Sequence, residues 1–358
     1  MKPIRVIQWG TGNVGTHSLR GIVERSDMEL VGLRVYNADK VGRDAGSFIG
    51  RGPTGVIATD DVERLFATPA DCVVYNALAE TMPGGEPVAV AEICRLLQSG
   101  KNVVSTGVSH HIHPRVAEPR MRSQIEAACD AGGTTFFSSG VNPGYAFDLW
   151  PIVMTHLSRR IDRLVCSEYC DMTAYTSASA MAFMGFGLAP EVRSLMEDAH
   201  ADPYRSAYYA SMLLLGDALG VHFDSVTFRR EVATAPDATV TPAGIYPAGT
   251  VVATRLIFTA HVSEVPRIEF RVIWRVRDDV EQAWGSGDGI WTVDIEGDPD
   301  VRCSLDVRTS TDSGRAVSIT TAMHPLNAVP AVVRAPAGFV SHLDLPLYSG
   351  GWVATSEK

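Results

Sequence analysis

The sequence predicts an α/β protein with an N-terminal doubly wound parallel sheet and a second, α+β domain whose open sheet is mostly antiparallel. Three observations support this fold class. An apolar strand near the start of the chain runs into a glycine-rich turn. Strand and helix patterns then alternate to about residue 140, which is typical of a parallel sheet. Beyond residue 160 the pattern changes to long strands of alternating polarity, which favour an antiparallel sheet.

The first strand and turn predict a dinucleotide site of the Rossmann type. The apolar strand 4–9 leads into Gly10-x-Gly12-x-x-Gly15, and an amphipathic helix follows. Gly10 permits a tight turn, Gly12 lets the backbone approach a pyrophosphate, and Gly15 lets the helix pack close to the strand. The free amides of that helix then face the phosphates. The residues expected to contact the cofactor here are Gly10, Thr11, Gly12, Asn13, Val14 and Gly15.

The end of the second strand, 29–36, is where the adenosine ribose is expected. A carboxylate there would bind both ribose hydroxyls and repel a 2'-phosphate. The sequence instead has Asn37, followed by Lys40 and Arg43. Cations attract a phosphate, so NADP(H) is favoured and NAD(H) is possible. The alternative is that Lys40 and Arg43 belong to a solvated turn.

The next segments repeat the alternation. Strands are expected at 56–57, 71–78, 102–105 and 134–137, and helices at 60–66, 86–98 and 116–131. Ligands of such a sheet bind at the carboxyl ends of its strands. The further cofactor contacts expected there are Asn76, Ala77, Ser105, Thr106, Gly107, Asn142 and Pro143. Asn142-Pro143 also suits a rigid hinge, with a helix beginning near Tyr145.

Three histidines follow the strand 102–105 directly. A histidine near a nicotinamide could act as a general acid at neutral pH, so His110 and His111 are candidate catalytic residues. A metal site is disfavoured because adjacent side chains diverge and no supporting Cys or carboxylate spacing is visible. A solvated loop remains the alternative.

The second domain is expected from residue 145 to 322, between a first domain at 1–144 and a C-terminal segment at 323–358 that returns to it. Strands are expected at 164–171, 225–234, 250–263, 267–277, 289–295 and 302–309. A helix is expected at 204–219, and another at 314–333, broken at Pro325 and Pro330. Two open sheets meeting face to face would form a symmetric homodimer.

A substrate pocket is expected in the second domain and in the cleft beside it. The stretch 174–187 has no charged residue and suits an apolar lining, although such residues are more often plain core. The candidate pocket residues are Val108, Tyr169, Tyr175, Met181 and Asn327.

Composition excludes several function classes. The formal net charge of -10, without a Lys or Arg cluster, argues against nucleic acid as a partner. No apolar run reaches the ~18 residues of a membrane span, and no charged-then-apolar leader precedes Ile4, so we expect a cytoplasmic protein. The six cysteines show no CxxC spacing, and we expect reduced, mostly buried thiols.

Several motifs resemble the 2,4-diaminopentanoate dehydrogenase family, which includes native amine dehydrogenases and is similar in fold to dihydrodipicolinate reductase. They are the segments 10–15 (GTGNVG), 39–46 (DKVGRDAG), 100–105 (GKNVVS), 140–144 (GVNPG) and 327–333 (NAVPAVV), followed by Asp344-Leu345-Pro346. The resemblance spans most of the chain. It implies NAD(P)-dependent interconversion of an amine with a ketone plus ammonia, in a homodimer, on a small and largely apolar substrate.

One position departs from the family pattern. The resemblance implies a glutamate just after the strand 102–105, where this sequence has Val108. Valine cannot accept a proton, so Glu80, His110 or His111 takes over that work, or the chain runs another reaction. The alternatives are a carbonyl or unsaturated-ring reductase on the same scaffold, and a cofactor-binding sensor or pseudoenzyme.

Overall fold

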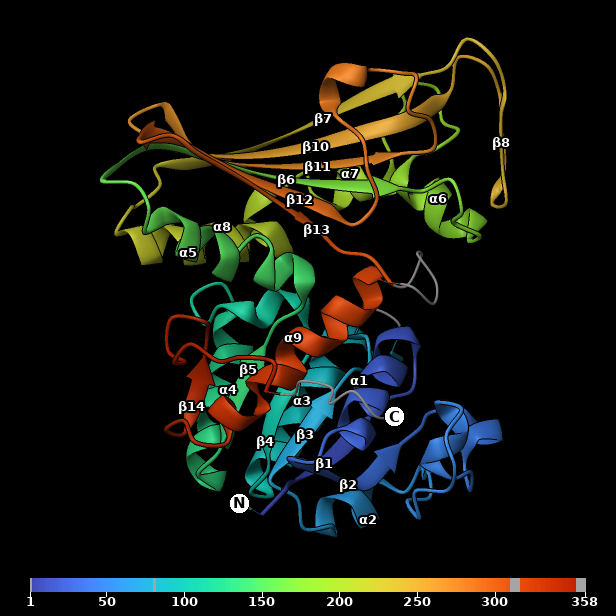
Figure 1. Ribbon diagram of the computed structural model, residues 1–358, viewed down its shortest axis with the longest axis vertical. Coiled ribbons are helices and arrows are strands. Elements are labelled where there is room, and N and C mark those ends of the chain that lie inside the picture. The colour runs from blue at the N-terminus through green and yellow to red at the C-terminus, as the bar shows by residue number, and fades with distance from the viewer. Residues whose placement is uncertain (1, 80–81, 310–315, 352–358) are drawn as a thin grey trace, which may run out of the picture. The chain divides into compact units, whose positions relative to one another are not determined.

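The computed structural model describes residues 2–79, 82–309 and 316–351 (Figure 1). The chain divides into two compact units. Unit 1 consists of Met1–Tyr145 together with Val317–Lys358, and unit 2 consists of Ala146–Ala316. The sequence placed these divisions at 144/145 and 322/323.

Unit 1 contains a six-stranded parallel sheet with the strand order β14-β5-β4-β3-β1-β2, and helices cover both faces of this sheet (Figure 1). Its elements are β1 (Ile4–Trp9), α1 (Asn13–Glu24), β2 (Met28–Arg34), α2 (Val62–Ala67), β3 (Cys72–Tyr75), α3 (Gly85–Gln98), β4 (Asn102–Ser105), α4 (Pro119–Gly132), β5 (Thr135–Ser138), α9 (Ala316–Val332) and β14 (Gly338–Val340). Side chains of α3 and α4 pack on one face of this sheet, and side chains of α1 and α9 on the other. The doubly wound parallel sheet is thereby confirmed.

One of the six strands expected in the first domain is not formed, and another strand completes the sheet. The prediction of a strand at 56–57 was wrong, because Ile57 forms only an isolated bridge with Asp44. The Asp44 carboxylate accepts hydrogen bonds from the amides of Gly46, Thr54 and Gly55, which fold this segment on itself. The sixth strand is β14, which joins the sheet from the C-terminal segment by pairing with β5.

Helix α9 continues through Pro325 and Pro330, so the expected break was wrong. A proline inside a helix removes one backbone hydrogen bond. The helix is held instead by burial, since Leu326, Val329 and Val332 have no exposed surface and pack in the core cluster of the sheet. The expected helix start near Tyr145 was also wrong: residues 141–145 form a non-helical turn, and α5 begins at Leu149.

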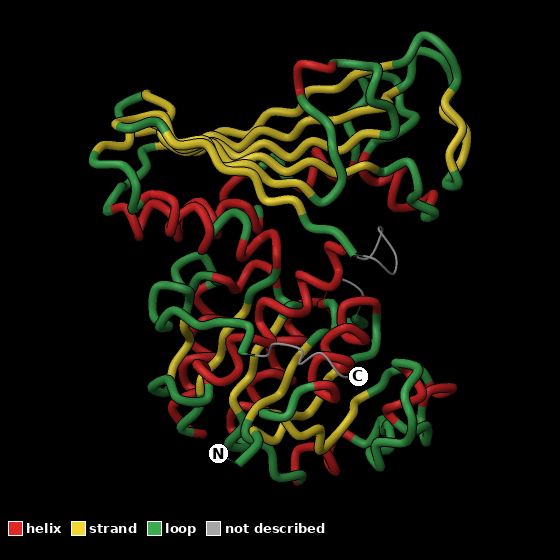
Figure 2. Tube along the Cα trace, viewed as in Figure 1, coloured by secondary structure: helices red, strands yellow, loops and turns green. Residues whose placement is uncertain are grey.

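Unit 2 contains a second six-stranded sheet with the order β13-β12-β6-β11-β10-β7, which Figure 1 labels and whose strands are yellow in Figure 2. Only β6 and β11 pair in parallel, so the sheet is mixed and mostly antiparallel, as expected. Its elements are α5 (Leu149–Thr155), β6 (Arg160–Asp171), α6 (Ala178–Met184), α7 (Leu195–Ala199), α8 (Ala207–Leu219), β7 (Ser225–Thr234), β10 (Val251–Val262), β11 (Val265–Arg275), β12 (Ile290–Asp298) and β13 (Val301–Asp306), with β8 (Thr239–Thr241) and β9 (Gly244–Tyr246) as a separate hairpin.

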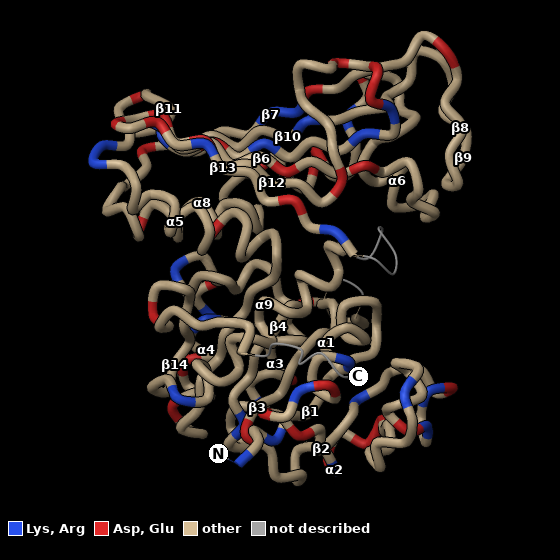
Figure 3. Tube along the Cα trace, in the orientation of Figure 1, with Lys and Arg blue, Asp and Glu red and all other residues tan. Residues whose placement is uncertain are grey.

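The two faces of this second sheet differ in chemistry. On the inner face, Phe270 packs on Phe147 with ring centroids 4.6 Å apart, and Phe258 packs on Tyr208 of α8 at 4.9 Å. The outer face carries alternating charges, with Glu269 paired to Arg163 and Arg271; charged positions recur along these strands in Figure 3. Strand alternation therefore sends one set of side chains to a packed core and the other to an ionic surface.

Two further observations concern membrane-spanning helices and cysteines. None of the helices in the described ranges is long and apolar enough to cross a membrane. All six cysteines are free thiols in the structure, and three of them, Cys72, Cys129 and Cys166, are buried.

A buried pair of histidines joins the C-terminal segment to Ser139, the residue that follows β5. Nε2 of His324 lies 2.8 Å from Nε2 of His342, which lies 3.4 Å from Oγ of Ser139. Tyr348 OH is 3.2 Å from the His324 ring nitrogen. Burial lowers the pKa of His342 from 6.5 to about 4 and also lowers that of His324, where the neighbouring His342 adds to the effect. Both rings are therefore neutral near pH 7.

We predict that acid destabilises unit 1 through this pair. Unfolded histidine takes up its proton near pH 6.5, whereas His342 resists it until about pH 4. Stability is thus complete above pH 6.5 and is lost as the pH falls, by about 2 kcal/mol at pH 5. Urea unfolding at pH 7.5 and pH 5 measures this loss. It should shrink in His342→Gln and persist in His222→Gln, which alters an exposed histidine; equal losses in all three proteins would contradict the prediction.

Candidate functional site

Hydrogen bonds tie the carboxyl ends of three parallel strands together. The buried Gln8 side chain donates through Nε2 to the carbonyl of Gly10 at 2.8 Å and to Oδ1 of Asn76 at 2.8 Å. Asn76 in turn donates through Nδ2 to Oγ1 of Thr106 at 2.8 Å. These residues lie on or just after β1, β3 and β4, so the network fixes the positions of the three strand ends. Ligands of this fold bind at that edge of the sheet.

The three turn glycines are needed for different reasons: Gly10 for its backbone conformation, Gly15 for close packing and Gly12 for access to the backbone. Gly10 has a φ of +96°, which favours glycine. A Cβ on Gly15 would lie 2.3 Å from the Gly10 carbonyl oxygen, so only glycine lets α1 start this close to the turn. A Cβ on Gly12 would meet nothing within 4 Å, because that face opens into solvent space at the N-terminus of α1. This is where a phosphate can reach the amides.

A groove of about 640 Å³ lies along this edge of unit 1. It is lined by Gly10, Thr11, Gly12, Asn13, Val14, Tyr36, Asn37, Lys40, Asn76, Ala77, Leu78, Met82, Pro83, Thr106 and Thr321. Ten of the residues predicted as cofactor contacts are in this lining: Gly10, Thr11, Gly12, Asn13, Val14, Asn37, Lys40, Asn76, Ala77 and Thr106. Its size, its exposed glycine backbone and the helix N-terminus fit an extended dinucleotide.

The other predicted contacts lie outside the lining. Gly15 packs against Gly10, and Arg43 places its guanidinium 4.6 Å from the centre of the Phe48 ring. Ser105 accepts a hydrogen bond from the Gly107 amide, and a Cβ on Gly107 would lie 2.0 Å from the Ala77 carbonyl oxygen. These residues shape the strand ends. Asn142 and Pro143 lie in the turn that follows β5.

One end of the groove is built from polar and aromatic side chains. Lys40 donates through Nζ to the carbonyl of Thr11 at 3.0 Å and to its hydroxyl at 3.1 Å. Tyr36, which is 43% exposed, donates its hydroxyl to Oε2 of Glu92, and the same oxygen accepts from Trp9 and Tyr75. Burial, together with the Glu92 charge, raises the pKa of both tyrosines, so the phenols stay neutral donors.

The histidine segment lies away from the groove lining. His111 is 1% exposed, its Nδ1 is 3.2 Å from Oε1 of Glu86, and its ring stacks on Phe339. Hydrogen bonding to His111 is the main cause of the lowered pKa of Glu86. His110 is 41% exposed and lies 3.9 Å from the same carboxylate. Val108 is buried in the core cluster beside α3 and α4, and Glu80 lies outside the described residues.

The predicted pocket residues are scattered. Tyr169 lines a hollow on the outer face of the second sheet, and Tyr175 is 45% exposed. Met181 is buried in α6. Asn327 on α9 accepts a hydrogen bond from Arg25 at 2.6 Å, a contact that joins α9 to the end of α1.

The groove residues that the sequence interpretation missed include Tyr36 and Thr321, and it also missed Gln8, whose hydrogen bonds support the strand ends. Gln8 is a polar residue inside an apolar strand, and that contrast could have identified it. Tyr36 precedes Asn37 and was interpreted only as the last residue of the strand 29–36, not as a cofactor contact. Thr321 comes from α9, about 300 residues after the turn that it faces, and nothing local signals it. The neighbouring Ser318 accepts a hydrogen bond from Asn13 at 2.7 Å, which fixes this end of α9.

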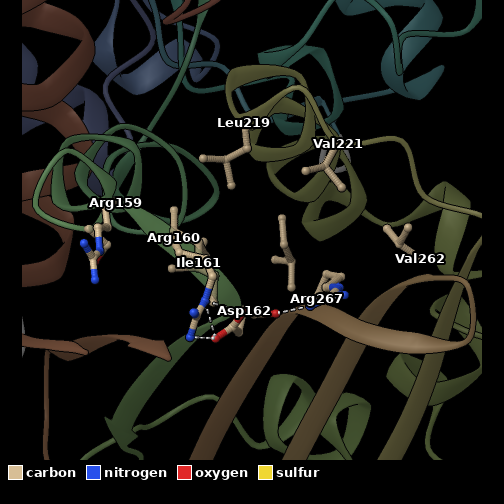
Figure 4. Close-up of a pocket in the computed structure, with 11 residues that line it drawn as sticks. Arg159, Arg160, Ile161, Asp162, Leu219, Val221, Val262 and Arg267 are labelled. Atoms are coloured by element: carbon tan, nitrogen blue, oxygen red, sulfur yellow. Dashed lines mark hydrogen bonds and ion pairs between the residues drawn. The ribbon is translucent and has the colours of Figure 1, made fainter. Parts of the chain in front are cut away.

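A second hollow, of about 370 Å³, lies within unit 2 (Figure 4). Leu219, Val221 and Val262 form an apolar side. Across from them, Arg160 is paired with Asp162, and Arg267 donates to the Asp162 carbonyl oxygen at 2.7 Å. Asp162 thus contacts both arginines, Arg160 through its carboxylate and Arg267 through its backbone carbonyl.

Two glycine substitutions should separate folding from cofactor binding. In Gly12→Ala the new methyl group enters open groove space, so we predict an unchanged Tm and at least a tenfold weaker affinity for NADPH. In Gly15→Ala the methyl group collides with the Gly10 carbonyl, so both Tm and affinity should fall. Thermal unfolding and NADPH fluorescence titration measure the two effects. A Gly12→Ala protein that binds NADPH as the wild type does would show that the cofactor lies elsewhere.

Comparisons with known proteins show the family to which the chain belongs. Residues 145–356 match the family model of the 2,4-diaminopentanoate dehydrogenase C-terminal domain. The chain is 32% identical to an amine dehydrogenase of Streptomyces virginiae, over 96% of each chain, and 22% identical to the 2,4-diaminopentanoate dehydrogenase of Acetoanaerobium sticklandii, over 97% of this chain and 94% of that one. The solved amine dehydrogenase of Mycobacterium smegmatis has the same fold, with a TM-score of 0.73 and 23% identity over 97% of both chains. The resemblance seen in the sequence is confirmed: the chain belongs to the 2,4-diaminopentanoate dehydrogenase family and is an NAD(P)-dependent oxidoreductase.

Proposed function

We propose that this protein is an NAD(P)-dependent amine dehydrogenase that interconverts a small, largely apolar amine with the corresponding ketone and ammonia. The observation that carries this proposal is the groove with its exposed glycine backbone, in a chain that matches a named amine dehydrogenase over 96% of its length. When bound, the nicotinamide supplies or takes up the hydride. Fold alone does not decide the reaction, so the choice of amine chemistry depends on the family.

In this proposal the residues at the groove bind different parts of the cofactor or support the residues that do. The backbone at Gly12 and the N-terminus of α1 hold the pyrophosphate through amide hydrogen bonds. The hydrogen bonds of Gln8 and Asn76 keep the strand ends in place beneath it. Tyr36, fixed by Glu92, provides a rigid wall for the adenosine end. These groups bind and orient the cofactor, and they move no proton.

The assay that tests the reaction is NADPH and NADH oxidation with a panel of small ketones, each with and without excess ammonium chloride. We predict that ammonia raises turnover at least tenfold for the preferred ketone. Turnover that does not depend on ammonia would establish a carbonyl reductase on the same scaffold. The absence of turnover, despite measurable NADPH binding, would favour a cofactor-binding sensor.

We further propose that NADP(H) is the preferred cofactor. The proposal is supported by Lys40, whose ammonium group lies at the groove beside Thr11, and by Asn37, which has no charge to repel a 2'-phosphate. None of the described residues that line the groove is acidic. A carboxylate at the end of β2 would bind the ribose hydroxyls and repel the phosphate.

The substitution Asn37→Asp should therefore shift the preference toward NADH. We predict at least a tenfold fall in the ratio of kcat/KM for NADPH to that for NADH, because the new charge acts on the phosphate of one cofactor alone. Asp39→Asn, two positions further along, is the control and should leave the ratio within about twofold. An unchanged ratio in Asn37→Asp would place the adenosine ribose away from this position.

A homodimer remains the proposed assembly. The outer face of the second sheet presents Glu269 between Arg163 and Arg271, with Glu231 paired to Arg255 nearby. Alternating charges of this kind can pair with their own copy across a two-fold axis.

A further inference from the structure

We propose that the hollow of unit 2 shown in Figure 4 binds a small organic anion, a monocarboxylate with an apolar body, through the guanidinium group of Arg267. All the residues that line this hollow belong to unit 2, so the site is separate from the cofactor groove of unit 1. Its volume of about 370 Å³ is within the range of small-molecule sites. This second site is independent of the amine dehydrogenase function.

Two irregular strand pairings build one end of the hollow. The register of β10 with β11 shifts near His261, and Arg267 is the extra residue of β11 at that shift. The register of β12 with β6 shifts near Gly297, and Asp162 is the extra residue of β6 there. Because β6 and β11 are neighbouring strands, the two bulges lie at the same end of the sheet. A β-bulge bends its strand and redirects a side chain.

The bulge in β11 brings a cation beside apolar surface. Consecutive residues of a regular strand point to opposite faces of the sheet. At this bulge, however, Arg267 and the buried Ile268 both line the hollow. Arg267 donates through Nη1 to the carbonyl oxygen of Asp162 at 2.7 Å, so the bulge in β6 holds the guanidinium group in place.

The charge of Arg267 differs from that of the other two arginines at the hollow. Arg159 is paired with Asp298, and Arg160 is paired with Asp162. Within the described ranges, Arg267 has no ion pair, and its one hydrogen bond goes to a neutral carbonyl oxygen. A guanidinium group has five N–H donors in a fixed fork and stays charged in proteins. Arg267 therefore has donors for a carboxylate, which it can bind through two parallel hydrogen bonds.

The opposite side of the hollow determines what the anion must carry. Leu219, Val221 and Val262 lie across from Asp162 in Figure 4, and all three keep some exposed surface. A hydrocarbon group that covers these side chains removes apolar area from water, which is favourable. An inorganic anion gains nothing from that surface, and an alkylammonium ion is repelled by Arg267. A carboxylate on a hydrocarbon body satisfies both sides.

The two sides of the hollow are tied together before a ligand binds. A tight turn with a φ of +50° at Ser263 and +65° at Glu264 joins β10 to β11. The Asp224 carboxylate accepts a hydrogen bond from the Ser263 amide, and the Asp224 amide donates to the carbonyl of His261 at 2.9 Å. Asp224 follows α8, so these bonds connect the hairpin of Arg267 to the segment that carries the apolar side. A preformed site lowers the entropic cost of binding.

Isothermal titration calorimetry of the full chain with sodium hexanoate tests this site at constant ionic strength. We expect saturable binding of one hexanoate per chain. Hexanamide has the same body without the charge, and acetate has the charge without the body. Each should bind at least tenfold more weakly than hexanoate, because each lacks one of the two contacts. Equal affinities for hexanoate and hexanamide would overturn the pairing with Arg267.

Matched variants assign the binding to this hollow. In Arg267→Gln the affinity for hexanoate should fall at least tenfold, while the amide side chain can still donate to the Asp162 carbonyl. Arg229→Gln alters an exposed arginine of the same sheet outside the hollow and should titrate as the wild type does. The far-ultraviolet circular dichroism spectrum reports folding. If Arg267→Gln does not fold, Val221→Asp leaves both bulges intact, places a negative charge on the apolar side and should weaken hexanoate binding at least tenfold.

Three results would overturn the proposal. They are the absence of saturable hexanoate binding to the wild type, a wild-type affinity in a folded Arg267→Gln or Val221→Asp protein, and competition between hexanoate and NADPH. Competition would place the anion in the groove of unit 1, whereas saturating NADPH should leave the hexanoate affinity within twofold. The titration needs no turnover, so its outcome is read separately from the ammonia dependence of the reaction.

Discussion

The hydrogen bonds of one buried side chain, Gln8, hold the ligand edge of the parallel sheet together. Its amide nitrogen reaches the Gly10 carbonyl and the Asn76 side chain, and Asn76 extends the chain of bonds to Thr106. A buried amide that lost these partners would cost about 1–3 kcal/mol, so the three strand ends are coupled. The close approach of Gly15 to the Gly10 carbonyl depends on this turn geometry, and the groove depends on both.

The parts of the fold that local chemistry determines were predictable. Strand β1, the glycine turn and helix α1 follow from an apolar run, three glycines and a helical repeat within the first 25 residues. The cofactor contacts near the turn were predictable for the same reason, since backbone amides need only the correct spacing. Strand β14 has three residues and pairs with β5 about 200 residues earlier, so its only signal is tertiary. Helix α9 likewise continues past its prolines because the core beneath it is apolar.

Side-chain chemistry at the site was harder to predict, because it depends on contacts between distant segments. His111 looked available as an acid, but its partners Glu86 and Phe339 come from α3 and β14. Glu168, an inward residue of β6 in unit 2 and outside the groove, depends on distant segments in the same way. Its partners Trp274 and Trp291 are more than 100 residues away, and only strand pairing brings the two indoles to one carboxylate. Glu80 falls outside the described residues.

The return of the chain to unit 1 has a consequence for biosynthesis. Unit 2 is one continuous stretch, whereas unit 1 needs Val317–Lys358 to supply an edge strand, a second helix on the α1 face of the sheet and two of the partners of Arg25. A ribosome makes the N-terminal part first. The five strands of that part therefore lack the cover of α9 on one face of their sheet while the intervening 171 residues are made. The domain that begins first is thus completed last, and the nascent chain carries an exposed apolar surface that chaperones recognise.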